Sequence, residues 1–216
     1  MEITLHPSAS PIQPRKIFAI GRNYAKHARE LGNQVPGKPV VFMKPLTALW
    51  PSDQPIPFPR HGKELHHEAE LVVLIGKGGR HITAEAALDH VAGYGIGLDL
   101  TLRDVQQELK SGGLPWELAK AFDASAPIGL FTRSVSDPQN LRIRCEVNGV
   151  CRQDGNTGDM IFPIPVLISY LSGIFTLEPG DLIFTGTPDG VGPLNSGDVV
   201  SVSISEIGET VFTVGS

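Results

Sequence analysis

Short apolar segments, each closed by glycine or proline, limit what this chain can fold into. The 216 residues include 24 Gly and 18 Pro, spread along the whole length. Glycine and proline interrupt regular structure, and at this frequency they favour many short strands joined by turns over a few long helices. The sequence has no internal repeat, low-complexity segment or long polar linker. It therefore predicts a single domain over residues 1–216, of the α+β class and rich in strands.

Apolar runs and turn signals place the individual elements. The sequence predicts strands at residues 16–20, 40–44, 68–75, 91–100, 141–147, 181–185, 198–204 and 209–214. It predicts helices at residues 24–31, 83–90, 101–110 and 163–175. The third helix opens with Thr101-x-x-Asp104, which resembles a capping box. Asn148-Gly149 is typical of a type I′ turn between two antiparallel strands.

Charge and hydropathy exclude several classes of partner. The formal net charge is −5 and basic residues form no run, so we expect no nucleic-acid partner. Apolar stretches are too short to span a bilayer, and residues 1–4 do not open a signal peptide. We therefore expect a cytoplasmic protein with no membrane contact. Cys145 and Cys151 flank the predicted turn and could face each other, but in that compartment we expect them reduced.

Two glutamates on one predicted strand suggest a cation site. Because side chains alternate across a strand, Glu68 and Glu70 share a face with His66, while Ala69 and Leu71 point toward a core. Like charges this close repel unless water or a cation lies between them, and a hard divalent ion with oxygen ligands would resolve the repulsion. A solvated acidic edge strand is the commoner arrangement. Spacing alone leaves both interpretations open.

Four further residues could take part in binding or catalysis. Asp99 ends an apolar strand just before a helix, where aspartate commonly caps. Lys120 lies in an apolar setting, although most lysines lie at the surface. His27 and Glu30 stand three apart on a predicted helix. That spacing suits a dyad in which the carboxylate orients a general base, and it equally suits a surface ion pair.

The glycine clusters do not predict a nucleotide site. Gly93-x-Gly95-x-Gly97 lacks the spacing of the dinucleotide fingerprint, and residues 76–79 lack the Lys-Ser/Thr of a phosphate loop.

Five motifs stand in order between residues 17 and 202. They are GRNYAKH at 21–27, HHEAE at 66–70, LDLTLRDVQ at 98–106, LPWELAKAF at 114–122 and TGTPDGVG at 185–192. Together they resemble the fumarylacetoacetate hydrolase family, in particular its short single-domain acylpyruvase or fumarylpyruvate hydrolase branch.

The resemblance assigns roles to particular residues. It implies that Glu68, Glu70 and Asp99 hold Mg²⁺ or Mn²⁺, and that Lys120 is catalytic. It implies a general-base dyad of His27 and Glu30 on a mobile lid. It also implies substrate contacts from Arg22, Tyr24, Arg103, Gln106 and Thr187.

The same resemblance implies a fold and an activity. The fold would be the family's mixed β-sandwich roll in a homodimer, with the lid helix in residues 1–50 and the metal-binding core in residues 51–216. The substrate would be a small 2-oxo or 2,4-dioxo acid. The activity expected first is hydrolysis of an acylpyruvate, such as fumarylpyruvate or acetylpyruvate, to pyruvate and a carboxylic acid.

Other activities remain open at this stage, because a fold does not dictate a reaction. One is decarboxylation or tautomerisation of oxaloacetate, and another is isomerisation or decarboxylation of an aromatic ring-cleavage product. A catalytically silent binding protein would be expected to have lost a metal carboxylate or the lysine, and all of these residues are present.

Overall fold

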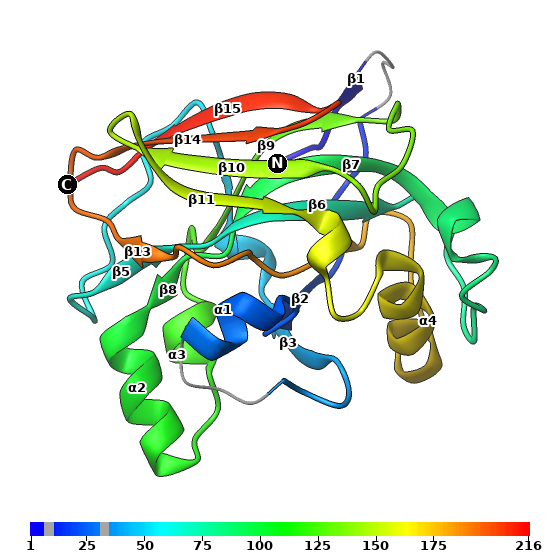
Figure 1. Cartoon of the computed structure of the whole chain (residues 1–216), viewed down its shortest axis with the longest axis horizontal. Coiled ribbons are helices and arrows are strands. Elements are labelled where there is room, and N and C mark those ends of the chain that lie inside the picture. The colour runs from blue at the N-terminus through cyan, green and yellow to red at the C-terminus, as the bar shows by residue number, and fades with distance from the viewer. Residues whose placement is uncertain (7–10, 31–34) are drawn as a thin grey trace.

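The computed structural model describes residues 1–6, 11–30 and 35–216, and its architecture is α+β, as predicted. An eight-stranded mixed sheet packs against a four-stranded antiparallel sheet (Figure 1). The larger sheet contains, in spatial order, β1 (Leu5–His6), β9 (Ala126–Thr132), β7 (Val91–Leu98), β6 (Ala69–Ile75), β12 (Leu182–Phe184), β2 (Ile17–Gly21) and β3 (Val40–Lys44), with β4 (Leu49–Pro51) paired to β9.

Two smaller sheets complete the strand framework. The four-stranded sheet contains, in order, β11 (Val150–Asn156), β10 (Arg142–Val147), β14 (Val199–Ile204) and β15 (Gly208–Thr213). A three-stranded sheet contains β13 (Gly192–Pro193), β5 (Leu65–His67) and β8 (Thr101–Leu102). Every predicted strand is found, with ends within two residues of those expected.

The hairpin between β10 and β11 confirms the predicted turn. Asn148 and Gly149 have φ angles of 52° and 75°, the paired positive values that a type I′ turn requires. Cys145 is buried and Cys151 is exposed, and both are free thiols. The two cysteines therefore do not face each other across the hairpin.

Helices are short and lie around the sheets. They are α1 (Ala25–Glu30), α2 (Arg103–Gly112), α3 (Glu117–Lys120) and α4 (Ile164–Ile174), with 3-10 turns η1 (Leu46–Ala48), η2 (Ala87–His90) and η3 (Thr157–Asp159). The end of the first predicted helix, at Leu31, lies outside the described residues. None of the helices within the described ranges is long and apolar enough to cross a membrane.

The predicted helix at 83–90 is wrong, because only the 3-10 turn η2 forms there. Tertiary hydrogen bonds fix both sides of the segment. Ile82 N donates to Ser172 Oγ at 2.9 Å, and Gly76 N donates to the carbonyl of His90 at 2.8 Å. These tertiary contacts at both ends decide the backbone conformation of the segment, and they outweigh its helix propensity.

The capping box predicted at the start of α2 is also wrong. The Thr101 hydroxyl donates to Glu68 Oε1 at 3.1 Å instead of capping the helix. The Asp104 carboxylate accepts from Lys63 N at 2.8 Å and Glu64 N at 3.4 Å. Both side chains join α2 to the segment before Glu68, and the helix begins at Arg103.

Strand β6 is buried on both faces, and this fixes where its carboxylate lies. Ala69, Leu71 and Val73 join the larger core, which confirms the predicted inward face. Val72 and Leu74 face a smaller core on the other side of the sheet. Since side chains alternate, Glu70 lies on the side of this smaller core.

The glycines of β7 make room for aromatic rings in the smaller core. A Cβ atom at Gly95 would lie 2.5 Å from the ring of Phe131, and one at Gly97 would lie 2.7 Å from Phe184. Glycine is therefore the side chain that lets these rings pack against the strand.

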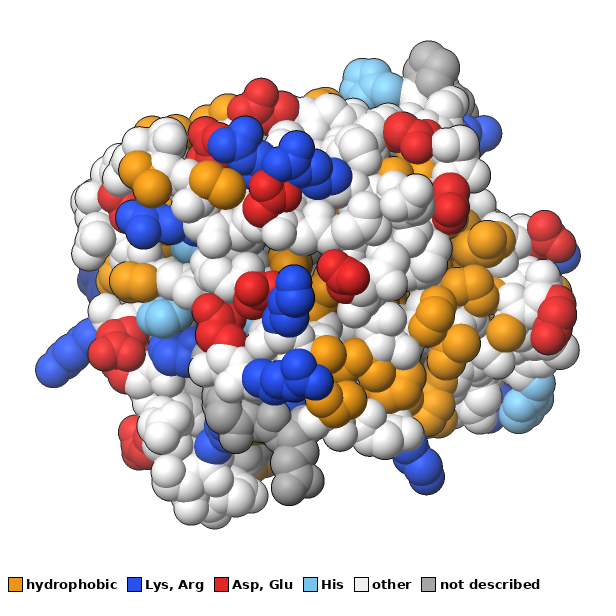
Figure 2. Space-filling model, in the orientation of Figure 1, with side chains coloured by type: hydrophobic (Ala, Val, Ile, Leu, Met, Phe, Trp, Pro, Cys, Tyr) orange, Lys and Arg blue, Asp and Glu red, His pale blue; other side chains and the backbone are white. Residues whose placement is uncertain are grey.

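Helix α4 covers the edge of the larger core with one face. Leu167, Ile168 and Leu171 are buried against the core, whereas Val166 and Ile174 are exposed. Apolar side chains gather around this helix on the surface (Figure 2).

The N-terminal segment is part of the main sheet. Strand β2 runs parallel to β12, with Ile17 opposite Leu182, and antiparallel to β3 on its other side. The predicted lid segment 1–50 and core 51–216 therefore share one sheet, so the chain cannot be divided there into two folding units.

Replacing Gly95 with alanine should destabilise the protein by about 1–3 kcal/mol, because the added methyl group overpacks the buried Phe131 ring. Urea denaturation would measure this loss. The matched control is Gly173→Ala in α4, where a Cβ would meet nothing within 4 Å. Its stability should stay equal or rise by about 0.5–1 kcal/mol. Equal losses in both variants would contradict the packing role of Gly95.

Candidate metal centre and adjoining cavity

Three carboxylates meet at one end of the main sheet. Each of Glu68, Glu70 and Asp99 offers an oxygen, and these atoms all lie within 4.8 Å of one another. All three residues are at most 5% exposed. The register of β6 and β7 brings them together, because Ala69 pairs with Leu98 and Asp99 N donates to the Glu68 carbonyl at 2.9 Å. This burial rules out a solvated acidic edge strand.

Three cations surround the carboxylates. Lys120 Nζ lies 2.8 Å from Glu68 Oε2 and 2.7 Å from Asp99 Oδ2. Lys44 Nζ lies 2.7 Å from Asp99 Oδ1, and a guanidinium nitrogen of Arg103 lies 2.7 Å from Glu68 Oε1. Buried charges are tolerated when they are paired in this way.

The carboxylates differ in how easily they ionise. Burial raises the pKa of Glu70 well above its ordinary value, and the charges of Asp99 and Glu68 raise it further. Burial also opposes ionisation of Glu68, but the charges of Lys120 and Arg103 outweigh it and lower the pKa of Glu68. The negative charge around Glu70 is thus the part of the cluster that nearby cations neutralise least.

This donor set fits a divalent cation. Carboxylate oxygens are the ligands that Mg²⁺ and Mn²⁺ prefer, and the raised pKa of Glu70 shows that the cluster resists holding three negative charges by itself. A bound cation would relieve that repulsion. The structure brings the three predicted ligands together, and their role as ligands remains a prediction.

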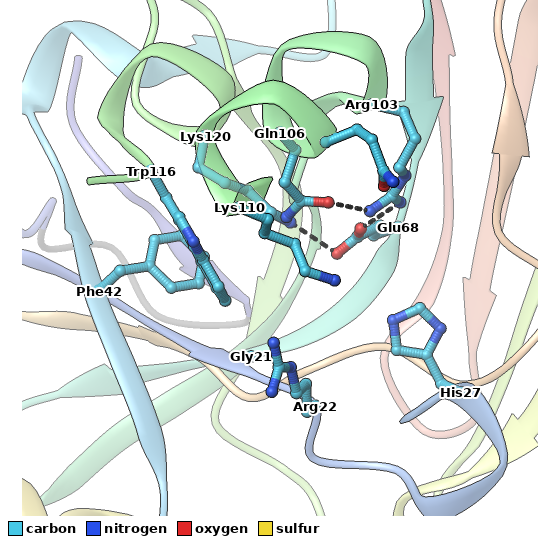
Figure 3. Close-up of a pocket in the computed structure, with 11 residues that line it drawn as sticks. Gly21, Arg22, His27, Phe42, Glu68, Arg103, Gln106, Lys110, Trp116 and Lys120 are labelled. Carbon is cyan, nitrogen blue, oxygen red and sulfur yellow. Dashed lines mark hydrogen bonds and ion pairs between the residues drawn. The ribbon is translucent and has the colours of Figure 1, made fainter. Parts of the chain in front are cut away.

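A cavity with a volume of about 70 Å³ adjoins the carboxylates (Figure 3). Its lining residues are Gly21, Arg22, His27, Phe42, Glu68, Arg103, Gln106, Gln107, Lys110, Trp116 and Lys120. Arg22, Arg103 and Gln106 were predicted substrate contacts, and they meet in this cavity. His27 and Lys120, predicted to be catalytic, line it as well.

His27 and Glu30 form a pair at the cavity wall. His27 Nδ1 lies 3.3 Å from Glu30 Oε2. In the tautomer that donates from Nδ1 to this carboxylate, Nε2 is the ring nitrogen that can accept a hydrogen bond. His27 is 4% exposed. The pair therefore has the arrangement of an oriented general base.

The pair is joined to a loop far away in the sequence. Gly190 N donates to both carboxylate oxygens of Glu30, at 3.1 and 3.2 Å. Gly190 has a φ of 93°, and a Cβ there would lie 2.0 Å from the Arg152 carbonyl oxygen. Only glycine fits this turn, which places the N–H that holds Glu30.

The other two predicted substrate contacts lie outside the cavity lining. Thr187 donates its hydroxyl hydrogen to the Ala69 carbonyl at 2.8 Å. Tyr24 is buried, its hydroxyl has no hydrogen-bond partner among the described residues, and burial followed by the charge of Glu70 raises its pKa. Substrate contact by Thr187 and Tyr24 remains a prediction.

Gln153 is a site residue that the sequence did not reveal. Its side-chain oxygen accepts from Ala69 N at 3.0 Å and lies 3.1 Å from His67 Nδ1. Its side-chain nitrogen donates to Thr187 Oγ1 at 2.7 Å and to the Pro188 carbonyl at 2.8 Å. It thereby fixes the backbone between Glu68 and Glu70 to the loop that holds Glu30. A glutamine in a polar strand gives no sequence signal for this role.

Four cavity or cluster residues were missed for a similar reason. Lys44 is buried, and the only indication of this in the sequence is its position at the end of an apolar strand. Trp116 packs edge-on against Phe42, with ring centroids 5.9 Å apart. Lys110 reaches the cavity from α2. Only the tertiary structure brings these side chains to one place.

Comparisons with known proteins show which family the chain resembles. The family model for the C-terminal domain of fumarylacetoacetate (FAA) hydrolase matches residues 16–215. The oxaloacetate tautomerase YcgM of Escherichia coli (strain K12) is 51% identical over 191 residues, which are 87% of this chain and 87% of the relative. The mitochondrial oxaloacetate tautomerase FAHD1 of Bos taurus is 48% identical over 202 residues, 93% of this chain and 91% of the relative.

Solved structures resemble the chain over its full length. The crystal structure of fumarylpyruvate hydrolase from Pseudomonas aeruginosa in complex with Mn²⁺ and pyruvate has a TM-score of 0.95 and 40% sequence identity. The match covers 100% of this chain and 95% of that chain.

Saturating Mg²⁺ should raise the melting temperature, because a ligand of the native state stabilises it. At a hundredfold excess over Kd the gain is about 2.7 kcal/mol, or roughly 5–10 °C for a chain of this size. Asp99→Asn should abolish the shift in differential scanning fluorimetry. Asp181→Asn removes a buried carboxylate elsewhere, which accepts from Lys16 N, and should melt lower yet keep the shift. An undiminished shift in the Asp99 variant would contradict the assigned ligand.

Proposed function

Because this chain belongs to the fumarylacetoacetate hydrolase family, we propose that it is a divalent-cation-dependent enzyme that enolises small 2-oxo acids. Keto–enol tautomerisation of oxaloacetate is the principal reaction of this proposal. The observation that carries it is one cavity lined by both His27, an oriented base, and Glu68 of the carboxylate cluster.

Glu68, Glu70 and Asp99 would hold a divalent cation, Mg²⁺ or Mn²⁺, which when bound would supply Lewis-acid chemistry at the 2-oxo group of the substrate. The protons on C3 would then be more acidic, so a base of ordinary strength could remove one.

The protein residues move the proton. His27 Nε2 accepts it from C3, the electrons of the C–H bond form the C2–C3 double bond, and negative charge develops on the 2-oxo oxygen. Glu30 stabilises the imidazolium through Nδ1. Return of the proton from His27 to the oxygen completes the enol, and the reverse sequence regenerates the ketone.

Lys120 is placed to stabilise the developing charge. An ammonium group has three donors, and two of these serve Glu68 at 2.8 Å and Asp99 at 2.7 Å. Lys120 also lines the cavity, which leaves its third N–H for the substrate oxygen. Burial opposes its charge, but Asp99 and Glu68 outweigh burial and raise the pKa of Lys120, so the side chain stays cationic.

Hydrolysis of a 2,4-dioxo acid is the second candidate. The same dyad would remove a proton from water, whose oxygen bonds to C4 while the C3–C4 bond breaks and its electrons pass to C3. Return of that proton from the dyad to C3 would give pyruvate and a carboxylic acid. The likeness to the fumarylpyruvate hydrolase structure, at 40% identity, supports this reaction. The tautomerases are 48% and 51% identical over most of the chain, and this higher identity supports tautomerisation as the first choice.

The homodimer and the mobile lid remain predictions, and so does the cytoplasmic location. The Bos taurus relative is named as a mitochondrial protein.

The enol form of oxaloacetate absorbs in the ultraviolet, so its decay to the ketone tests the proposal directly. We expect Mg²⁺ to support turnover and EDTA to abolish it. His27→Gln should lower kcat by about 10²–10⁴-fold, because it removes the base, and should keep the melting shift with Mg²⁺. His6→Ala, which changes an exposed histidine on β1, serves as the control with full activity.

Pyruvate release from fumarylpyruvate and acetylpyruvate tests the second candidate in parallel. Metal-dependent pyruvate release with no acceleration of oxaloacetate tautomerisation would make hydrolysis the function. Full tautomerase activity in His27→Gln would contradict the role of the dyad.

A further inference from the structure

The cavity carries more positive than negative side chains. Among the residues the structure describes along its lining, Arg22, Arg103, Lys110 and Lys120 are cationic, while Glu68 is the one carboxylate. The protein as a whole has a net charge of −5, so this local excess is specific to the site. A cavity lined with one sign of charge concentrates ligands of the opposite sign.

The four cations enter the cavity from different elements. Arg103 and Lys120 form ion pairs with Glu68 and so adjoin the carboxylate cluster. Arg22 enters from the segment after β2 and Lys110 from α2, and both side chains reach into the space between Trp116 and His27 (Figure 3).

The backbone at Arg22 is held in an unusual conformation that aims its side chain. Arg22 has a φ of 59°, a left-handed value that is uncommon for residues other than glycine. The next residue, Asn23, is fully buried and donates to the carbonyls of Phe162 at 3.1 Å and Thr185 at 2.8 Å. The Arg22 guanidinium lies 5.7 Å from the ring centroid of Trp116, within range of a cation–π contact.

Lys110 comes from the last turn of α2, opposite Arg22. Burial lowers its pKa, and the charges of Arg22 and Arg103 lower it further. The three cations are therefore close enough to repel one another. An anion between Arg22 and Lys110 would relieve that repulsion.

We propose that Arg22 and Lys110 bind a second carboxylate of the substrate, so that the enzyme selects 2-oxo dicarboxylates over monocarboxylic 2-oxo acids. This inference rests on the proposed function for the orientation of the substrate. The first carboxylate and the 2-oxo oxygen face the carboxylate cluster, and the far carboxylate lies between the two cations. Arginine suits this role because its planar guanidinium matches the two oxygens of a carboxylate.

This orientation also places the reacting carbon. The substrate carbons between its two ends pass the cavity wall that His27 forms. Arg22 and Lys110 would thus both neutralise the far carboxylate and position the substrate. A substrate with a methyl group in place of the far carboxylate would make neither interaction.

Exchange of C3 protons with deuterium, followed by NMR in D₂O with Mg²⁺, tests the selectivity on a matched pair. Oxaloacetate and 2-oxobutyrate have the same four carbons, with a carboxylate in one where the other has a methyl group. Arg22→Gln and Lys110→Met should each lower kcat/KM for oxaloacetate by about tenfold to a hundredfold, the effect of losing a charge-assisted hydrogen bond. Exchange of 2-oxobutyrate, slow in the unchanged enzyme, should not fall further.

Arg29→Gln is the matched control, because it removes an exposed cation of α1 outside the cavity lining. It should leave both rates unchanged. Equal losses for the two acids in the Arg22 and Lys110 variants would overturn the proposal. Equal exchange of both acids by the unchanged enzyme would overturn it as well.

A binding measurement separates this inference from the proposed function. Isothermal titration in Mg²⁺ with 2-oxoglutarate and 2-oxopentanoate, which share five carbons, needs no turnover. Tighter binding of the dicarboxylate that disappears in Lys110→Met supports the assignment, even if no acid exchanges its protons and the proposed enolisation fails. Equal binding of the two probes by the unchanged protein would refute the assignment by itself.

Discussion

The balance between three carboxylates and three cations at one end of the main sheet governs the rest of the site. Burying an isolated charge costs several kcal/mol, so Glu68 and Asp99 are stable where they lie because Lys44, Arg103 and Lys120 contact them. In ionised form the six side chains sum to zero. A divalent cation would add two positive charges to this cluster, and an anionic group bound beside the cation would offset part of that charge.

Hydrogen bonds from distant parts of the chain keep this cluster and the base in one place. Gln153 joins the strand between Glu68 and Glu70 to the loop at Pro188, and that loop holds Glu30 through Gly190. The three carboxylates and the His27–Glu30 pair thus share a single support. A shift of the loop would move the base relative to the carboxylates, and small displacements between reacting groups are costly for catalysis.

The sequence predicted the parts of this molecule whose signals are local. Apolar runs ended by turn residues located the main strands. The spacing of the glutamates left a cation site and a solvated edge strand both open, and the resemblance carried by the five motifs implied that Glu68, Glu70 and Asp99 hold a metal. Strand β9 was missed because Pro127 and Gly129 are typical of chain breaks. The helix expected at 83–90 failed because contacts with Ser172 and Gly76, invisible in local sequence, outweigh helix propensity.

Some site residues could be recognised from the local sequence, and others could not. His27 and Glu30 are recognisable as a pair because they stand three positions apart on one helix. Lys44, Lys110 and Gln153 are residue types that mostly occur at the surface, and nothing near them in the chain marks them as different. Their roles arise from the topology, which joins segments that are tens of residues apart in the chain.

The topology also dictates the order of assembly. Glu30 and its partner Gly190 are 160 residues apart. At about 5–20 residues per second, the ribosome makes the second roughly ten seconds or more after the first. Until then β2 has no β12 beside it, so the nascent chain must emerge almost whole before the base is set in place.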